Sequence, residues 1–341
     1  MRLSRARTPP TKGAGTLCVW LPHAPPERAL DEVRNRLARH VHLVVGPERP
    51  NEDVHVLVQG RPTADQLAEN PTLRALVIPY AGVPAETRHL LLDLRSDLPV
   101  YNLHHNASAA AELALALFLA AAKSLLPVDR TFRAHDWRSR YDGAQMLLLE
   151  GRTAVVLGYG AIGRRIARAC AALGMSVSAV RRHPGSPDAE HVRVFGMERL
   201  PELLPTAAAL FVALPLTPDT EGLIGAEELN SLPSDSIVVN VARGAIVDED
   251  ALFTALKEQR IAGAGLDVWY TYPSTVEDRA RTPPSRHPFR DLSNVVMSPH
   301  RGGAFRVEEL ERRRMIDLAQ TVNALARGDC PPHRVDVHAG Y

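Results

Sequence analysis

Short apolar runs alternate with amphipathic segments along the first hundred residues. The apolar runs are rich in Val, Leu and Ile, and helix-like segments separate several of them. Alternation of this kind predicts a mostly parallel sheet that is covered by helices on both faces. We expect strands at Thr16–Leu21, His42–Val45, Val54–Gln59, Arg74–Pro79 and Pro99–Leu103, and helices at Glu27–Arg39, Ala64–Glu69 and Ala85–Leu94.

A second series of apolar runs begins at Thr153 and also alternates with helix-like segments. Before it lie a long Ala- and Leu-rich predicted helix, Ala107–Leu126, and a charged, aromatic segment, Val128–Asp142, that has the composition of an interaction surface. The last predicted helix, Val307–Arg327, carries an apolar stripe that must pack on other parts of the chain. Six strands alternating with helices predict a doubly wound dinucleotide-binding domain. We expect these strands at Thr153–Leu157, Ser176–Val180, Ala208–Leu214, Ser236–Val241, Gly263–Val268 and Asn294–Met297.

A glycine-rich turn, Gly158–Gly163, lies between the first strand of the second series and a helix-like stretch, Arg164–Leu173. In a dinucleotide-binding turn the first glycine allows a tight turn, the second lets the backbone approach a pyrophosphate, and the third lets the helix pack on the strand. The pyrophosphate then lies at the helix N-terminus, where free N–H groups and the helix dipole favour negative charge. The turn therefore predicts a nicotinamide or related dinucleotide as cofactor.

Length and composition narrow the class of protein. The chain has 341 residues, of which 45% are hydrophobic and 23% charged, and its formal net charge is +1. This length favours two domains, and the small net charge gives no field that would attract nucleic acid or an anionic membrane. The longest apolar run, Leu113–Ala122, is too short to cross a bilayer, and the basic segment Met1–Gly15 lacks the apolar core of a signal peptide. Three cysteines without metal-like spacing fit a reducing cytoplasm, and we expect no metal site. From the small net charge and the short apolar runs we expect no nucleic-acid or membrane partner.

Three further motifs follow strands of the second series: Pro215–Thr220, Asn240–Asp248 and Ser298–His300. In an open α/β sheet, ligands bind beyond the carboxyl ends of the strands, so we expect these segments to converge near the nicotinamide. Together with the glycine turn and Leu266-Asp267-Val268, they resemble the D-isomer specific 2-hydroxyacid dehydrogenase family.

The first half of the chain carries weaker parts of the same resemblance. The turn Tyr80-Ala81-Gly82 is similar to the family's substrate loop, and Asn106–Glu112 is similar to its hinge helix. The resemblance implies two doubly wound parallel-sheet domains: a flavodoxin-like substrate domain of residues 1–106 and 299–341, and a Rossmann NAD(P)-binding domain of residues 107–298. It also implies a homodimer formed through the dinucleotide domains, for which Leu113–Trp137 has the apolar and aromatic content.

The resemblance assigns the chemistry to an arginine and a histidine. Arg243 would bind the carboxylate and carbonyl of a small 2-oxo acid, since a guanidinium offers a bidentate fork and stays charged. His300 would act as general acid, because the pKa of an imidazole lies close to the working pH. The alternatives are that Arg243 pairs with a surface carboxylate such as Asp248 and that His300 is structural. The expected substrate-binding residues are Tyr80, Ala81, Gly82, Arg243 and His300.

The chain departs from the family pattern at the third catalytic position. The family's glutamate, which orients the histidine, lies five positions after the aspartate of the Leu-Asp-Val motif, and Tyr272 occupies that slot here. A neutral phenol can hydrogen-bond an imidazole but cannot stabilise an imidazolium by charge. We therefore expect His300 to be a weaker base than its family counterparts, unless Glu277 or Asp278 reaches it. The alternative is that Tyr272 only packs against Pro273.

The end of the second strand bears on the choice of cofactor. An Asp or Glu that binds the ribose of NAD normally stands there, whereas this chain has Arg181-Arg182-His183. Because a guanidinium pairs with a 2′-phosphate, NADP is favoured over NAD; the alternative is a solvated pair of charges that tolerates either. Asp267 resembles the residue that holds the nicotinamide carboxamide, although it could instead cap the following turn. The expected cofactor-binding residues are Gly158, Gly160, Ala161, Ile162, Gly163, Arg181, Arg182, Pro215, Val241, Ala242, Arg243, Asp267 and His300.

These motifs predict an oxidoreductase that transfers a hydride between NAD(P) and a small 2-oxo or 2-hydroxy acid. A rival interpretation is a dinucleotide-sensing, corepressor-like protein, or a catalytically impaired interaction protein, on the same fold. Only Tyr272 supports the rival. The presence of both Arg243 and His300 favours the enzyme, because function is argued from site residues and not from the fold.

Overall fold

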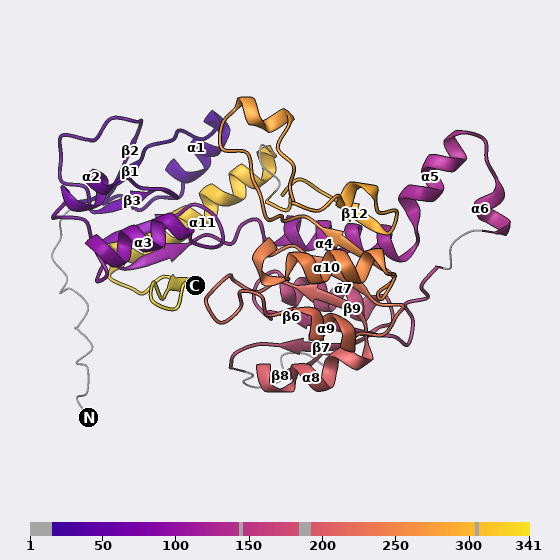
Figure 1. Ribbon diagram of the computed structural model, residues 1–341. Helices are drawn as coiled ribbons and strands as arrows, with labels where there is room; N and C mark the ends of the chain where they lie inside the picture. The colour runs from indigo at the N-terminus through magenta and orange to yellow at the C-terminus, as the bar shows by residue number, and fades with distance from the viewer. Residues whose placement is uncertain (1–15, 143–145, 184–191, 304–306) are drawn as a thin grey trace. The chain divides into compact units, whose positions relative to one another are not determined.

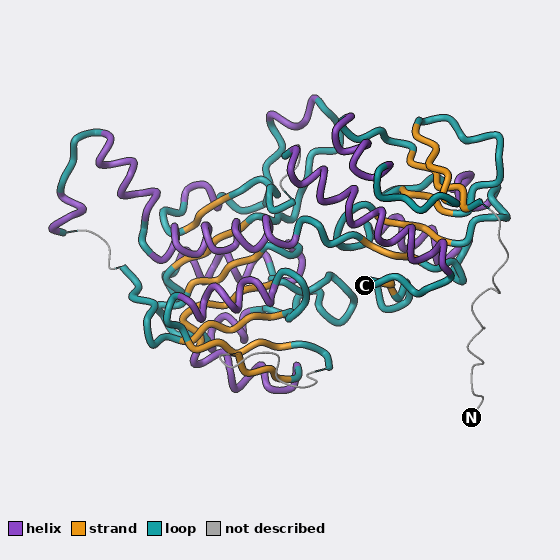
Figure 2. Tube along the Cα trace, turned by 180° about the vertical axis from the view of Figure 1, so that it is seen from behind, coloured by secondary structure: helices purple, strands orange, loops and turns teal. Residues whose placement is uncertain are grey.

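The computed structural model describes residues 16–142, 146–183, 192–303 and 307–341. The chain divides into two compact units, Met1–Asn106 with Phe305–Tyr341, and Ala107–Ala304. The predicted return to the first domain at residue 299 differs from this division, which keeps the residues up to Ala304 in the second unit. Figures 1 and 2 show the chain from opposite sides.

The first unit contains a six-stranded sheet in the order β13-β5-β4-β3-β1-β2. The first five strands of the chain pair in parallel, and β13 joins the edge antiparallel to β5. A parallel sheet requires crossover connections, which the helices of this unit supply. The strands are β1 (Leu17–Leu21), β2 (Val41–Val45), β3 (Val56–Val58), β4 (Ala75–Ile78), β5 (Val100–Asn102) and β13 (Arg334–Val335).

Helices cover both faces of this sheet. Side chains of successive strand residues point to opposite faces, so in β1 Val19 packs into one apolar cluster and Trp20 into another. The first cluster lies beneath α1 (Glu27–Arg34) and α11 (Glu308–Arg327), the second beneath α2 (Ala64–Ala68) and α3 (Ala85–Leu94). The apolar stripe predicted for the last helix thus packs on the sheet, with Leu318 and Val322 buried there.

The second unit contains a seven-stranded, wholly parallel sheet in the order β12-β11-β10-β9-β6-β7-β8. The chain runs outward from β6 through β7 to β8, and then returns to the other side of β6 to form β9. Such a reversal of strand order is where doubly wound sheets bind their ligands. The strands are β6 (Thr153–Leu157), β7 (Ser176–Val180), β8 (Val192–Phe195), β9 (Ala207–Val212), β10 (Ile237–Asn240), β11 (Gly263–Leu266) and β12 (Val295–Met297).

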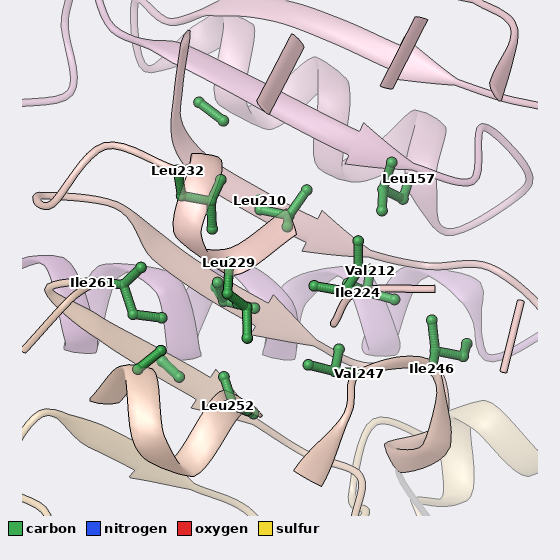
Figure 3. Close-up of a cluster of buried hydrophobic side chains, with 14 of the residues drawn as sticks. Leu157, Leu210, Val212, Ile224, Leu229, Leu232, Ile246, Val247, Leu252 and Ile261 are labelled. Carbon is green, nitrogen blue, oxygen red and sulfur yellow. The ribbon is translucent and has the colours of Figure 1, made fainter. Parts of the chain in front are cut away.

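Two apolar clusters hold helices against the faces of the second sheet. Phe118 of α4 (Ala107–Ala122) and Ile166 of α7 (Gly163–Ala172) are buried on one face. Figure 3 shows part of the cluster on the other face, where side chains of β6 and β9 meet those of α9 and α10. Burying one Leu or Val contributes roughly 1.5–3 kcal/mol, so these clusters fix the strand ends. The helices of this face are α8 (Leu200–Leu203), α9 (Ala226–Ser231) and α10 (Glu249–Lys257), and short 3₁₀ turns are η1 (Met197–Arg199), η2 (Leu204–Thr206), η3 (Gly244–Ile246), η4 (Glu277–Ala280) and η5 (Phe289–Asp291).

The long helix predicted from residue 107 ends earlier than expected. α4 stops at Ala122, Ser124 adopts a left-handed φ of 47°, and α5 (Leu125–Arg133) follows at an angle of 65°. Pro127 explains the break, because a proline lacks the N–H that a continuous helix needs. α5 and α6 (Arg138–Tyr141) extend away from the sheet of the second unit (Figures 1 and 2).

α4 and α5 pass a length and composition test for a membrane span only when they are taken together. In the part of the chain that the structure describes, no single helix is long and apolar enough to cross a membrane. The 65° bend separates the two helices that pass the test jointly. Much of α4 is buried under the sheet of its own unit.

Every predicted strand is present in the structure, with bounds that differ by a few residues, but two strands were not predicted. β8 is an edge strand whose Arg193 is exposed, so it lacks the continuous apolar run that marks the central strands. β13 is only two residues long. The fold class predicted from the sequence, two doubly wound parallel-sheet domains, is confirmed.

The glycine turn gives a test of this packing. An ideal Cβ at Gly163 would lie 1.8 Å from the Gly158 carbonyl oxygen, whereas one at Gly160 would meet no atom within 4 Å. Alanine at position 163 must push α7 away from β6. We expect Gly163→Ala to lower the free energy of unfolding by about 3 kcal/mol, and Gly160→Ala to change it by less than about 0.5 kcal/mol. Urea denaturation followed by circular dichroism measures both, and equal losses would contradict the packing described.

Candidate functional site

All seven strands of the second sheet end in line. The last residue of each pairs with the last residue of its neighbour, so the segments that follow them leave the sheet at one edge. This edge carries the glycine turn and the loops of Arg243, Asp267 and His300. The paired strand ends are Phe195, Val180, Leu157, Val212, Asn240, Leu266 and Met297.

The glycine turn lies at the reversal of strand order, between β6 and β9. Gly158 has a left-handed φ of 94°, and an ideal Cβ there would lie 2.4 Å from the Ala213 carbonyl oxygen. Gly160 is exposed, with open space where a Cβ would stand. Ile162, which precedes α7, provides no side-chain cap for the N-terminus of that helix. Open backbone at a helix N-terminus suits a phosphate, so the residues present fit a dinucleotide.

Two arginines flank the aromatic residue of this turn. The Cζ atoms of Arg164 and Arg181 lie 5.3 Å and 5.9 Å from the centroid of the Tyr159 ring, within the range of cation–π contact. Arg182 pairs with Asp219, Nη2 to Oδ2 at 3.2 Å, between exposed side chains. Arg181 therefore lies beside the glycine turn, as its predicted role requires. Arg164 adds a positive charge there that the sequence motifs did not single out.

The loop after β10 holds Arg243 through backbone contacts. The side chain of Asn240 donates to the Arg243 carbonyl at 2.9 Å and accepts from the Ala242 N–H at 3.0 Å. The Arg243 guanidinium is half-buried and donates to the Ala242 carbonyl at 2.6 Å. An ideal Cβ at Gly244 would lie 2.3 Å from the Trp269 carbonyl oxygen, so only glycine fits there. The loop is thus fixed from both sides.

Asp267 fixes the segment that carries His300. Its carboxylate is 1% exposed and accepts hydrogen bonds from the Ser298 hydroxyl at 2.5 Å and from the N–H groups of Arg301 and Gly302 at 2.7 Å each. Hydrogen bonds to a carboxylate are stronger than those between neutral groups. These contacts join Asp267 to a segment more than thirty residues further along the chain and not to the turn that directly follows it, and its contact with a nicotinamide stays a prediction.

Trp269 is a supporting residue that the sequence motifs did not indicate. Its indole Nε1 donates to the Ser298 carbonyl at 2.8 Å, so it holds the same segment as Asp267 does. Its position two residues after Asp267 is the only signal that the sequence offers. Of the remaining predicted cofactor residues, Ala161 and Ile162 lie in the glycine turn, Val241 and Ala242 in the loop after β10, and Pro215 in the segment after β9.

His300 adopts a left-handed φ of 55°, and its side chain is exposed. Partial desolvation lowers the pKa of the imidazole from its ordinary value of 6.5, the charge of Arg243 lowers it further, and Asp267 offsets part of this effect. Arg243 and His300 follow β10 and β12, two strands of the second sheet whose last residues lie at the same edge with β11 between them.

Tyr272 lies beside His300. The centroids of the two rings are 5.5 Å apart, and the ring planes are tilted by 59°. The phenolic oxygen accepts a hydrogen bond from the Trp269 backbone N–H at 3.2 Å. Burial raises the pKa of Tyr272 above 10, so the phenol is neutral at physiological pH. Tyr272 therefore touches the histidine without contributing a charge.

Two acidic side chains that could have served as partners have local structural roles. The Asp248 carboxylate caps α10, accepting a backbone N–H at 2.8 Å. The Asp278 carboxylate accepts bonds from the backbone and hydroxyl of Thr275 in its own turn. Arg243 and Asp267 are the charges that shift the pKa of His300.

The predicted substrate loop belongs to the first unit. It follows the carboxyl end of β4, and the Tyr80 hydroxyl occupies the space beside Gly60, whose ideal Cβ would lie 2.1 Å from it. Gly82 has a left-handed φ of 82° that favours glycine. Arg243, His300 and Tyr272, in contrast, are all residues of the second unit.

Comparisons with known proteins agree with this arrangement. Residues 115–302 match the NAD binding domain of the D-isomer specific 2-hydroxyacid dehydrogenases. A D-3-phosphoglycerate dehydrogenase of Mycobacterium leprae (strain TN) is 34% identical over 315 residues, which cover 88% of this chain and 55% of that protein. The chain thus spans about half the length of the first curated relatives that it matches.

A glyoxylate reductase of Aeropyrum pernix is 33% identical over 298 residues, which are 84% of both proteins. A crystal structure of a D-isomer specific 2-hydroxyacid dehydrogenase from Xanthobacter autotrophicus Py2, in complex with NADPH and MES, superposes with a TM-score of 0.78 and 26% identity, covering 96% of this chain and 100% of that one. The resemblance in the sequence motifs is confirmed: this chain belongs to the D-isomer specific 2-hydroxyacid dehydrogenase family.

Proposed function

We propose that this protein is an NAD(P)-dependent oxidoreductase that interconverts a small 2-oxo acid and the corresponding 2-hydroxy acid. The observation that carries the proposal is that Arg243 and His300 follow strand ends at the edge of the sheet that also carries the glycine turn. An anion-binding group, a proton donor and a dinucleotide turn are the three elements that hydride transfer to a 2-oxo acid requires. Family membership and the Aeropyrum relative, named a glyoxylate reductase, support the same class of substrate.

The roles of the two side chains follow from their chemistry. The guanidinium of Arg243 binds the substrate carboxylate and orients the adjacent carbonyl. A bound reduced nicotinamide supplies the hydride. His300 protonates the carbonyl oxygen during reduction and takes the proton back during oxidation. The roles of Tyr80, Ala81 and Gly82 in substrate binding stay predictions from the family resemblance.

NADP is proposed as the preferred cofactor, with NAD as the alternative. Arg181 follows β7 and lies beside Tyr159 of the glycine turn, where a carboxylate would be needed to bind the ribose of NAD. Arg164 adds a second positive charge beside the same ring. The Xanthobacter structure, which contains NADPH, supports this choice.

A homodimer is proposed through α5 and α6. Of the predicted surface, Leu113–Trp137, the part that belongs to α4 is largely buried within its own unit, so only the part after α4 is available for an interface. α5 and α6 have no buried residues and expose a set of large apolar side chains. Exposed apolar patches of this kind mark interaction sites. The exposed side chains are Leu125, Leu126, Phe132, Trp137 and Tyr141.

The first prediction tests the reaction. Arg243→Ala should lower kcat/KM for 2-oxo acids such as glyoxylate at least about 100-fold, while the Kd of NADPH changes little, because the substrate loses its anion-binding group. NADPH oxidation and fluorescence titration measure the two quantities, and Arg279→Ala, on an exposed turn, is the matched control. Loss of NADPH binding in Arg243→Ala would make the arginine structural. If the unaltered chain binds NADPH tightly but turns over no 2-oxo acid in a broad panel, the alternative of a dinucleotide-sensing, corepressor-like protein is favoured.

The second prediction concerns the cofactor. Arg181→Asp should weaken NADPH binding about 10- to 100-fold and leave NADH binding unchanged or stronger, because a carboxylate repels the 2′-phosphate and accepts ribose hydroxyls. Titration of both cofactors measures the ratio. Arg168→Asp makes the same charge change at an exposed position of α7 and should leave the ratio unchanged. Equal losses in both variants would indicate a nonspecific effect of charge.

The third prediction concerns pH. The pKa of His300 lies below 6.5, so the protonated fraction needed for reduction falls as pH rises through that low value. Tyr272→Glu places a carboxylate beside the imidazole and should raise its pKa by about one unit, shifting the alkaline limit of reduction to higher pH. Tyr272→Phe adds no charge and should leave the limit in place. Proton NMR titration of His300 and the pH profile of kcat/KM measure the shift, and a profile unmoved by Tyr272→Glu would remove the proposed influence of residue 272.

The fourth prediction concerns assembly. Trp137→Glu should convert the dimer into a monomer, because a charge in the centre of an apolar interface cannot be solvated or paired there. Val276→Glu, which alters an equally exposed apolar residue outside this surface, should leave the dimer intact. Light scattering after gel filtration gives the mass. A monomeric unaltered chain, or a dimer in both variants, would contradict the proposed interface.

A further inference from the structure

Three side chains with metal-binding atoms meet on the sheet of the first unit, in a place that the dehydrogenase site does not use. Cys18 of β1 pairs in register with His42 of β2, and Glu52 lies in the loop between β2 and β3. The ligand atoms of Cys18, His42 and Glu52 all lie within 4.8 Å of one another. Their separation along the chain explains why the spacing of cysteines and histidines in the sequence did not indicate a metal site.

The backbone holds the cysteine rigidly at the centre of this group. The Cys18 N–H donates to Nδ1 of His55 at 3.0 Å, and the Cys18 carbonyl accepts from the His55 N–H at 3.0 Å. The Cys18 side chain is buried, whereas the side chains of His42 and Glu52 are about half exposed. The thiol is therefore fixed, while the other two groups lie on the solvent side and leave a route for a cation.

The negative charge of the Glu52 carboxylate lies close to the Cys18 thiol, where a bound cation would compensate it. The Glu52 carboxylate lies 3.0 Å from Nδ1 of His42. Burial and, next, the charge of Glu52 raise the pKa of the Cys18 thiol to about 11, so it is protonated at neutral pH when no cation is bound. A bound divalent cation would compensate the carboxylate and deprotonate the thiol.

We propose that Cys18, His42 and Glu52 form a zinc site. Zn²⁺ takes thiolate, imidazole and carboxylate ligands at about 2.0–2.3 Å, and sites with three protein ligands complete the tetrahedron with water. Tetrahedral ligands at those lengths lie roughly 3.5 Å apart, so the three side chains reach that geometry through small side-chain movements. Magnesium and calcium do not fit, because they take oxygen ligands.

Binding is an exchange of a proton for a metal ion. The sulfur–hydrogen bond of Cys18 breaks, its proton goes to solvent, and the sulfur electron pair forms the bond to zinc. His42 binds as the neutral imidazole, and affinity therefore falls as pH decreases. No oxidant or reductant takes part. The metal would tie β1, β2 and the loop after β2 together, and so stabilise the first unit.

Cobalt reports the thiolate directly. The full chain is first stripped of metal with a chelator and then titrated with Co²⁺, which adopts zinc-like tetrahedral sites and gives a thiolate-to-cobalt charge-transfer band when a cysteine is a ligand. We expect this band to appear with one Co²⁺ per chain and to disappear when Zn²⁺ displaces the cobalt. Zinc should also raise the Tm. Absence of the band would overturn the proposal.

Matched variants locate the site. His42→Ala and Glu52→Gln alter half-exposed side chains and should weaken zinc binding, measured by calorimetry, at least about 100-fold. Loss of a residue that only hydrogen-bonds a metal ligand already lowers metal affinity about 10- to 100-fold, so loss of a ligand should cost at least as much. Cys18→Ser should abolish the charge-transfer band. Cys330→Ser and His23→Ala remove an exposed thiol and an exposed imidazole elsewhere and should leave zinc binding unchanged.

The outcome is independent of the proposed dehydrogenase function. The three ligands belong to the first unit and the predicted catalytic residues to the second, and NADPH binding is measured in the same preparations. Unaltered zinc affinity in both His42→Ala and Glu52→Gln would overturn the zinc site, whether or not the chain reduces 2-oxo acids.

Discussion

In the second unit, the last residues of seven strands pair with one another across the sheet, from Phe195 of β8 to Met297 of β12. Each strand therefore releases its loop at the same level, and loops far apart in sequence meet without any long connection. Gly158, Arg243 and His300 owe their common location to this alignment of strand ends. The apolar clusters on the two faces of the sheet hold the alignment, because a shift of one strand would break its packing with both layers of helices.

Buried hydrogen bonds fix the conformation of the segment that carries His300, which the sheet alone only places at its edge. Asp267 alone would be costly to bury as a carboxylate, but three donors from Ser298, Arg301 and Gly302 compensate its charge. The conformation of the segment that carries His300 therefore depends on Asp267. Trp269 acts in the same direction through the Ser298 carbonyl. Asp267 and Trp269 together hold the segment that carries His300.

The sequence predicted the fold and the site to different depths. Continuous apolar runs and the glycine turn located every central strand, because burial on both faces leaves a plain pattern. β8 and the break at Ser124 escaped, since an edge strand alternates with polar residues and Pro127, which explains the break, lies three residues beyond it, within the next helix. In the candidate site, motifs singled out Arg243 and His300, whose roles stay predictions, but the bonds of Asp267 depend on distances between segments some 30 residues apart and could not be read from spacing.

The contact between Gly244 and the Trp269 backbone has a consequence for how the site can vary. A continuous path of backbone contacts and hydrogen bonds runs from the Arg243 loop through Trp269 to Ser298 and His300. The loop of Arg243 and the segment of His300 are thus linked through Trp269. Residue 272 lies beside this path, joined to it by one hydroxyl bond. A charged residue at position 272 would therefore change the surroundings of His300 while leaving the contacts that join the two segments in place.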